Sequence, residues 1–161
     1  MNELIDQLDG YLARCRPDYY RQLQPGVSEQ ALDTFQSQVG VKLPPLFLHL
    51  YKWRNGQDAD CSANLTDNWM FTPIEEVISI KETLDGMIGT DFEEPNWWSR
   101  GWVPFLSNGG GDHLCLDLTA EFGGVPGQLV SFWHDWDNRS VKFPSMEAWL
   151  QAVVDSIAEK G

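Results

Sequence analysis

Three kinds of side chain that carry out chemistry in proteins occur in the second half of the chain. Cys115, His134 and an aspartate such as Asp117 or Asp135 could form a thiol-based triad. Nucleophilic catalysis of this kind needs a stabilised thiolate and an imidazole oriented by a third group. Only the residue types support the triad here, and a cysteine on a sheet face is more often a small buried apolar side chain. We therefore predict that the chain is not an enzyme, with a small Cys/His hydrolase as the least favoured alternative.

The spacing of other polar residues disfavours metal and phosphate sites. The potential metal ligands are His113, His134, Asp135 and Asp137. They lack the two close ligand pairs typical of zinc sites, and Arg139 replaces a ligand that a calcium loop needs. The glycines Gly109–Gly111 join two predicted strands and precede Asp112, whereas a phosphate-binding loop opens onto a helix N-terminus. We predict no metal and no cofactor, and expect Asp135, Asp137 and Asn138 to bond their own turn.

Negative charge is concentrated in one part of the chain. Residues 1–55 carry six basic and six acidic side chains, whereas residues 56–161 carry five basic and eighteen acidic ones, which is the whole net charge of −13. This charge argues against direct binding to nucleic acid or to an anionic membrane. It suits a basic protein partner, and it suits simple solubility equally well, so both interpretations stay open.

Two acidic loops with neighbouring tryptophans are the predicted partner-binding site. The acidic residues are Asp58, Asp60 and Asp67 in one loop and Asp91, Glu93 and Glu94 in the other. Trp97 and Trp98 follow the second loop, and adjacent residues of an extended segment point in opposite directions. One indole could therefore contact a partner, as tryptophans at interfaces often do. The alternative is that the pair braces the sheet.

The elements that must position these residues can be read from the apolar pattern. Helical spacing predicts a helix that begins at Leu4, a second helix capped by Ser28 and ended by Gly40, and a third over 46–54. Trp69–Phe71 is predicted as a short strand. Thr72 and Glu75 form a predicted capping box for the next helix. Ser145 is predicted to cap the last helix.

A hairpin over residues 102–118 is predicted at the centre of the fold. Leu114, Leu116 and Leu118 alternate with His113, Cys115 and Asp117, so the leucines share one sheet face and the other three side chains share the opposite one. Further strands are predicted over 128–133 and around 141–143. The expected fold is α+β: a single, mostly antiparallel sheet with helices packed on one face, N-terminal helices first and a C-terminal helix last, in one domain over 1–161.

Cysteine usage and hydropathy bear on location. The three cysteines, Cys15, Cys61 and Cys115, are odd in number and lack metal-like spacing, which is typical of reduced thiols in the cytoplasm. No basic-then-apolar leader and no apolar run of about 20 residues occurs. We predict a cytoplasmic protein that does not bind membranes.

Three blocks of this sequence resemble the SUKH superfamily, and within it the Smi/Knr branch of fungal cell-wall assembly regulators. The first block runs from Leu43-Pro44-Pro45 to Asn55-Gly56, and the second from Asn96-Trp97-Trp98 through the glycine loop to Asp117-Leu118. The third contains Gly127-Gln128-Leu129-Val130 and Phe132-Trp133-His134-Asp135, and closes on Phe143 and Trp149-Leu150. Together the blocks span residues 28–155.

The resemblance implies an α+β domain without known catalytic residues, and one of two roles. Bacterial members of this type resemble immunity proteins that bind and neutralise a toxin domain, often a nuclease, encoded beside them. Fungal members resemble regulatory scaffolds of cell-wall assembly. The expected function is that of an immunity protein whose partner is a basic toxin domain, with the regulatory scaffold as the alternative. The oligomeric state stays open.

Overall fold

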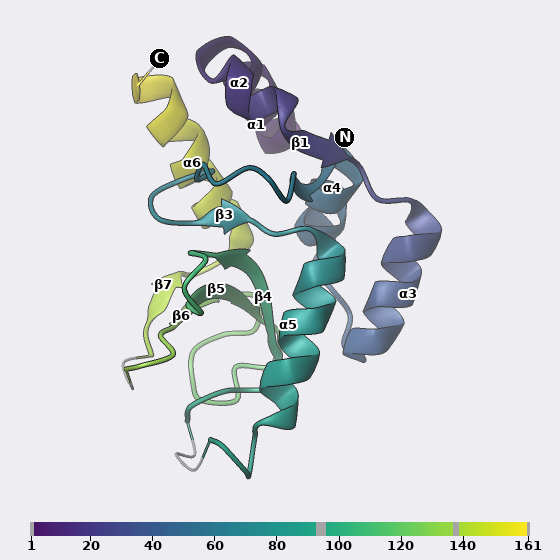
Figure 1. Cartoon of the computed structure of the whole chain (residues 1–161), viewed down its shortest axis with the longest axis vertical. Helices are drawn as coiled ribbons and strands as arrows, with labels where there is room; N and C mark the ends of the chain where they lie inside the picture. Colours follow the sequence, from purple (N-terminus) through teal and green to yellow (C-terminus); the bar gives the residue numbers. More distant parts are fainter. Residues whose placement is uncertain (1, 93–95, 137–138, 161) are drawn as a thin grey trace.

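The computed structural model describes residues 2–92, 96–136 and 139–160 of the chain (Figure 1). Its helices are α1 Glu3–Cys15, α2 Pro17–Arg21, α3 Glu29–Val39, α4 Pro45–Trp53, α5 Ile74–Gly86 and α6 Met146–Lys160. Its strands are β1 Leu23–Pro25, β2 Arg54–Gln57, β3 Met70–Phe71, β4 Trp102–Ser107, β5 His113–Asp117, β6 Leu129–Phe132 and β7 Val141–Phe143. In this described part, no helix is long and apolar enough to cross a membrane.

The strands form two antiparallel sheets, so the prediction of a single sheet was wrong. β3, β4, β5, β6 and β7 lie in that order in the larger sheet, and the predicted hairpin supplies its centre. β1 and β2 form a separate two-stranded sheet. The segment Asn55–Gly56 was predicted only to close the preceding helix, but it lies within β2. These short strands have no alternating apolar pattern, so nothing in the local sequence indicates their pairing.

The N-terminal and C-terminal helices follow the predicted local signals closely. α1 buries Ile5, Leu8 and Leu12 and packs beside α6 (Figure 1). Ser28 caps α3, because its Oγ accepts the Ala31 N–H at 3.2 Å. Gly40 ends α3 with a φ of +80°, which a glycine adopts without strain. Ser145 Oγ likewise accepts the Ala148 N–H at 3.1 Å at the start of α6.

The predicted capping box of α5 was wrong, and a residue distant in sequence replaces it. Asn55 Oδ1 accepts the Ile74 N–H at 2.7 Å, and Asn55 Nδ2 donates to both carboxylate oxygens of Glu75. Thr72 is buried, and its carbonyl oxygen accepts the Tyr51 hydroxyl. The start of α5 is therefore held by β2 rather than by its own sequence.

Both faces of the large sheet are covered, whereas one covered face was predicted. Leu114 and Leu116 lie on the expected face, in the main core with helices α1, α4 and α6. Cys115 lies on the opposite face, which carries a second, mainly aromatic cluster. That cluster comprises Trp98, Trp102, Cys115, Val130 and Phe132, with Leu84, Ile88, Phe92, Trp97 and Phe122 around it. The second cover comes from the end of α5 and from loops, whose apolar residues show no regular period.

Candidate functional site

Helix α5 carries two apolar stripes and forms one wall of an apolar groove. Ile74 and Val77 are buried in the main core, whereas Ile80 and Leu84 face a different direction. The groove has a volume of about 450 Å³, within the range of about 300–1,000 Å³ typical of binding pockets. Its lining is Ser79, Ile80, Thr83, Leu84, Met87, Phe92, Gly111, His113, Phe132 and His134. None of these lining residues is Lys, Arg, Asp or Glu.

His113 lines the groove as a neutral imidazole. Its side chain is only 6% exposed, its ring stacks on Phe132 with centroids 6.2 Å apart, and burial lowers its pKa from 6.5 to about 4. Nδ1 of His113 is buried without a hydrogen-bond partner. An unpaired buried polar atom costs about 1–3 kcal/mol, and because this nitrogen is itself enclosed by the protein, that cost falls on the folded state.

His134 marks the rim of the same groove and is held by two carboxylates. Its Nδ1 lies 2.8 Å from Asp112 Oδ1, its Nε2 lies 3.0 Å from Asp135 Oδ2, and its backbone N–H also donates to Asp112. The hydrogen bond to Asp112 raises the pKa of His134 above its ordinary value. Gly111 permits this packing: its φ is +99°, and a Cβ there would lie 3.2 Å from His134 Nδ1.

The first acidic loop begins near the start of α5, where Asp58 lines a pocket with Glu76, and ends beside α1 and α6, where Asp67 lines a pocket with Ile157. The second loop follows the end of α5 (Figure 1). Asp58, Asp60 and Asp67 are exposed before β3, and Asp91 is exposed after the helix, whose 13 residues span about 20 Å. Glu93 and Glu94 lie outside the described residues.

One face of α5 runs from Asp58 to the loop that carries Asp91, and Glu76 is its acidic residue on the helix. Glu76 is exposed on α5, and it lines the same small pocket as Asp58. Positions 76, 79, 83 and 87 follow one helix face, and that face leads from Asp58 to the groove and to the Asp91 loop. We call the surface made by Asp58, Glu76, Ser79, Thr83, Met87 and Asp91 the α5 face.

The two predicted tryptophans differ in exposure. Trp98 is 3% exposed, its Nε1–H donates to Asp85 at 2.8 Å, and its ring meets Trp102 edge-to-face at 5.3 Å. Its burial supports the alternative in which it braces the sheet. Trp97 is half-buried, and the Arg139 guanidinium lies 4.5 Å from its ring centroid. Trp97 thus remains partly accessible beside the α5 face.

The residues of the hypothetical thiol triad are not assembled. Cys115 is fully buried in the second cluster, and burial raises the pKa of its thiol well above the ordinary value. His134 is bonded to Asp112 and Asp135 at the rim, and Asp117 accepts hydrogen bonds from Thr119, Ala120 and Gln128 in its own loop. The described geometry therefore offers no activated thiolate at Cys115.

The other predicted turn residues serve their own loops. Asn108 Oδ1 accepts the N–H groups of Gly110 and Asp112, so the glycine loop is organised as a turn between β4 and β5. Within residues 2–92, 96–136 and 139–160, no group of three or more His, Cys, Asp and Glu side chains is placed to hold a metal ion. Asp137 and Asn138, which were predicted to bond their own turn, lie outside the described residues.

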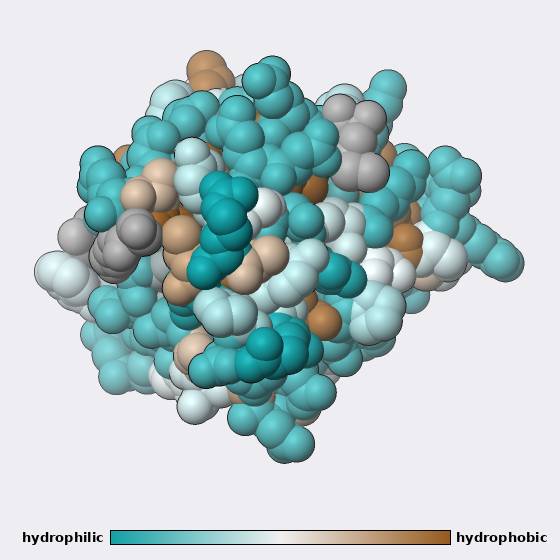
Figure 2. All heavy atoms as spheres, turned by 90° about the horizontal axis from the view of Figure 1, so that it is seen from above, coloured by the Kyte–Doolittle hydropathy of each residue, from teal (hydrophilic) through white to brown (hydrophobic). Residues whose placement is uncertain are grey.

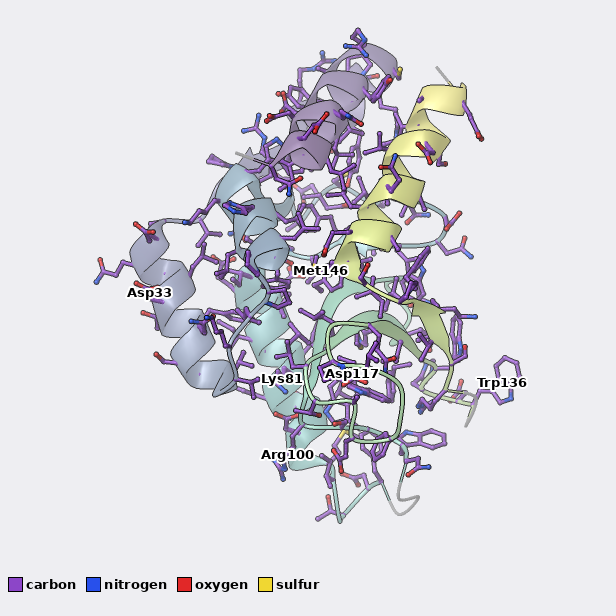
Figure 3. The ribbon with its side chains drawn as sticks, turned by 180° about the vertical axis from the view of Figure 1, so that it is seen from behind. Asp33, Lys81, Arg100, Asp117, Trp136 and Met146 are labelled. Atoms are coloured by element: carbon purple, nitrogen blue, oxygen red, sulfur yellow. The ribbon has the colours of Figure 1, made fainter. Side chains whose placement is uncertain are left out.

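Sequence reasoning missed the groove and the most exposed aromatic residue. Trp136 is 57% exposed and extends away from the body of the molecule (Figure 3). The sequence contains a signal for one wall of the groove. One core-facing stripe of α5 does not account for the apolar residues Ile80, Leu84 and Met87, so they indicate a second apolar face of the helix. The opposite wall, from β5 and β6, had none, because it depends on how distant strands pair.

The face seen from above in Figure 2 offers a contrast to the groove. It lies over the end of the molecule where Figure 1 places α1, α2 and the C-terminus, and it is mostly hydrophilic with scattered apolar side chains. A broad apolar area is not visible on that face.

The chain is similar in sequence to known proteins. The chain is similar to a protein described as "KNR4/SMI1 homolog 2" from Debaryomyces hansenii, at 28% identity over 64 residues. That match covers 40% of this chain and only 11% of the fungal protein. The model of the family described as SMI1 / KNR4 (SUKH-1) matches residues 26–152, which include α3 to β7, both walls of the groove and the first part of α6. On that match, the chain belongs to the SMI1 / KNR4 family (SUKH-1).

Proposed function

We propose that this chain is a non-catalytic binding domain that acts as an immunity protein: it binds a basic toxin domain and blocks it. The observation that carries the proposal is the acidic α5 face with an apolar groove in its middle. Eighteen of the 24 acidic side chains lie in residues 56–161, together with only five basic ones. A charged rim around an apolar centre is the usual layout of a specific protein interface.

The charge also suggests how neutralisation works. An acidic surface attracts a basic protein over a distance and raises the association rate, to as much as about 10⁸–10⁹ M⁻¹s⁻¹ at low salt. Basic grooves that bind nucleic acid are a natural target, since the α5 face carries the same sign of charge as a phosphate backbone. The proposed mechanism is occlusion of such a groove, with no bond made or broken.

A second candidate function is a regulatory scaffold domain that binds host proteins. The similarity to the much longer "KNR4/SMI1 homolog 2" of Debaryomyces hansenii favours it. A scaffold would bind several partners, and its gene would have no toxin gene beside it. The two functions share the absence of catalysis and differ in the partner.

The proposed function is tested by co-expressing this chain with the product of the adjacent gene. The immunity hypothesis predicts a stable complex after purification and loss of the toxin's activity in proportion to the amount of this chain. An Asp58→Lys, Glu76→Lys, Asp91→Lys variant should form the complex more slowly. A matched Asp6→Lys, Asp18→Lys, Asp33→Lys variant changes the total charge equally, at exposed positions of α1, α2 and α3. If the two variants behave alike, or no complex forms, the proposal is wrong.

A further inference from the structure

We propose that the rim of the groove carries a pH-operated latch: protonated His134 joins the carboxylates of Asp112 and Asp135, and loss of its proton releases Asp135. We call these three residues the rim cluster. Asp112 ends the glycine turn before β5, and His134 lies 22 residues later, in the turn that follows β6. The inference concerns this chain alone, so it goes beyond the proposed function and does not depend on the identity of a partner.

The evidence is that each ring nitrogen of His134 faces a different carboxylate. Nδ1 lies 2.8 Å from Asp112 Oδ1, and Nε2 lies 3.0 Å from Asp135 Oδ2. A neutral imidazole carries one N–H, so its other ring nitrogen presents a lone pair. A lone pair this close to a carboxylate oxygen is repelled, whereas an imidazolium attracts both carboxylates. The observed arrangement is therefore that of protonated His134.

The two carboxylates differ in how firmly they are held, and this decides which contact opens. The Asp112 side chain is 17% exposed, and it also accepts the backbone N–H of His134 and Nδ2 of Asn108, each at 2.8 Å. The Asp135 side chain is 87% exposed, so water can replace its contact with His134. After deprotonation the remaining ring proton thus stays on Nδ1, toward Asp112, and Asp135 is released to solvent.

Other charged groups near the groove keep their charge while His134 titrates. His113 of β5 is neutral above about pH 4, because burial lowers its pKa. The Arg139 guanidinium lies 4.6 Å from the ring centroid of Phe132 in the groove lining and remains a cation. Asp91 is exposed beside Phe92 of the same lining. The side chains that α5 places in the groove do not titrate: Ser79, Ile80, Thr83 and Leu84.

The latch changes the charge of the rim near neutral pH. The hydrogen bond with Asp112, and after it the charge of Asp135, raise the pKa of His134 above 6.5. The latch is thus closed in mild acid and opens as the pH rises through this raised pKa. With His134 protonated, the rim cluster and Arg139 sum to zero, and with His134 neutral they sum to one negative charge. Any molecule that approaches the groove therefore meets a rim whose charge depends on pH.

The test is an NMR titration of the full chain, labelled with ¹⁵N and ¹³C, from about pH 5 to about pH 9, the range in which histidines titrate. His134 is expected to titrate above 6.5. Its ¹⁵N shifts at high pH should show the Nδ1–H tautomer, whereas free histidine prefers Nε2–H. The side-chain carboxyl signal of Asp135 should move with the same midpoint as His134.

Three variants separate the two contacts from a general effect of charge. Asp135→Asn should lower the pKa of His134, and because Asp135 is exposed, this variant should fold normally. Asp112→Asn should lower the pKa of His134 further, since Asp112 makes the stronger contact. The matched control is Asp33→Asn, at an exposed position of α3 on the side of the molecule away from Trp136, the neighbour of Asp135 (Figure 3). It removes the same charge and should leave the titration of His134 unchanged.

Three results would overturn the inference. They are titration of His134 at or below 6.5, an Nε2–H tautomer at high pH, and equal titration curves of His134 in Asp135→Asn and Asp33→Asn. Complex formation with the adjacent gene product is scored separately, so the latch and the proposed function can fail independently.

Discussion

At the scale of single residues, two histidines near one groove have opposite protonation behaviour. His113 is buried and its pKa is lowered to about 4, whereas His134 is exposed at the rim and the hydrogen bond to Asp112 raises its pKa. The difference follows from surroundings, because burial disfavours the charged imidazole and a neighbouring carboxylate favours it. The two side chains thus give the groove a neutral lining and, in acid, a cationic point on its rim.

The buried histidine predicts a specific loss of stability in acid. Between pH 6.5 and about 4, the unfolded chain protonates His113 and the folded chain does not, so the free energy of unfolding falls as the pH falls. The slope is at most about 1.4 kcal/mol per pH unit. Urea unfolding at a series of pH values should show that His113→Phe gains stability over the wild type as the pH decreases through this window.

His134 provides the control with the opposite sign. Because the pKa of His134 is raised in the folded chain, its contribution to the free energy of unfolding is fully present at pH values below the pKa of the unfolded chain. That contribution is lost as the pH rises through the pKa of the folded chain. His134→Gln should therefore lose stability relative to the wild type in acid. If His113→Phe and the wild type show parallel pH profiles, then His113 titrates normally and our description of the groove is incorrect.

Cys115 predicts the outcome of thiol labelling. Because the side chain is fully buried and burial raises the pKa of its thiol, a thiol reagent at neutral pH should leave Cys115 unmodified in the native protein. Cys15 is partly exposed and should react first. Peptide mapping by mass spectrometry distinguishes them, and labelling in urea confirms that Cys115 can react. Rapid native labelling of Cys115 would revive the hydrolase alternative.

At the scale of elements, α5 depends on a contact that local sequence does not encode. Asn55, in β2, caps the helix through Ile74 N–H and also binds Glu75. Asn55→Ala should lower the free energy of unfolding by about 1–2 kcal/mol, the usual cost of losing a cap. Thr72→Val, at the residue that the local pattern favoured as the cap, should cost less. Denaturant titration of both variants checks this, and a larger loss for Thr72→Val would contradict the assignment.

Two other helices, α3 and α6, show what could be predicted from the sequence. Ser28, Gly40 and Ser145 act on residues within one helical turn, so their roles were predicted correctly. The central hairpin was predicted because its leucines alternate over a short distance. Asn55 acts on a helix start 19 positions away, and β1 pairs with β2 across α3 and α4. Such pairings depend on tertiary packing, which no local pattern reports.

The candidate site likewise has one part that could be predicted from the sequence and another that depends on tertiary packing. The acidic residues were found because charge can be counted, although Glu93 and Glu94 lie outside the described residues. The groove brings together α5, β5, β6 and the loop at Phe92, so its existence depends on the complete fold. From its residue type, His113 was considered only as a potential metal ligand. The absence of a partner for its Nδ1 is a property of packing alone.

At the scale of the whole molecule, charge and apolar surface have different distributions. Residues 1–55, which form α1 to α4, are neutral overall, and the part of the chain that includes α5 and the large sheet carries the whole charge of −13. A molecule with this asymmetry has a preferred direction of approach for a basic partner. We propose that the α5 face supplies attraction at long range and an apolar groove at contact.

The central claim is most directly tested by the association rate of this chain with the protein encoded next to it, measured over a series of salt concentrations. We predict fast association that slows steeply with added salt. The Asp58→Lys, Glu76→Lys, Asp91→Lys variant should associate about tenfold or more slowly at low salt, with a flatter salt dependence, because it loses electrostatic steering. The matched variant at Asp6, Asp18 and Asp33 should change much less. Equal rates for the two variants, or a rate independent of salt, would contradict the account.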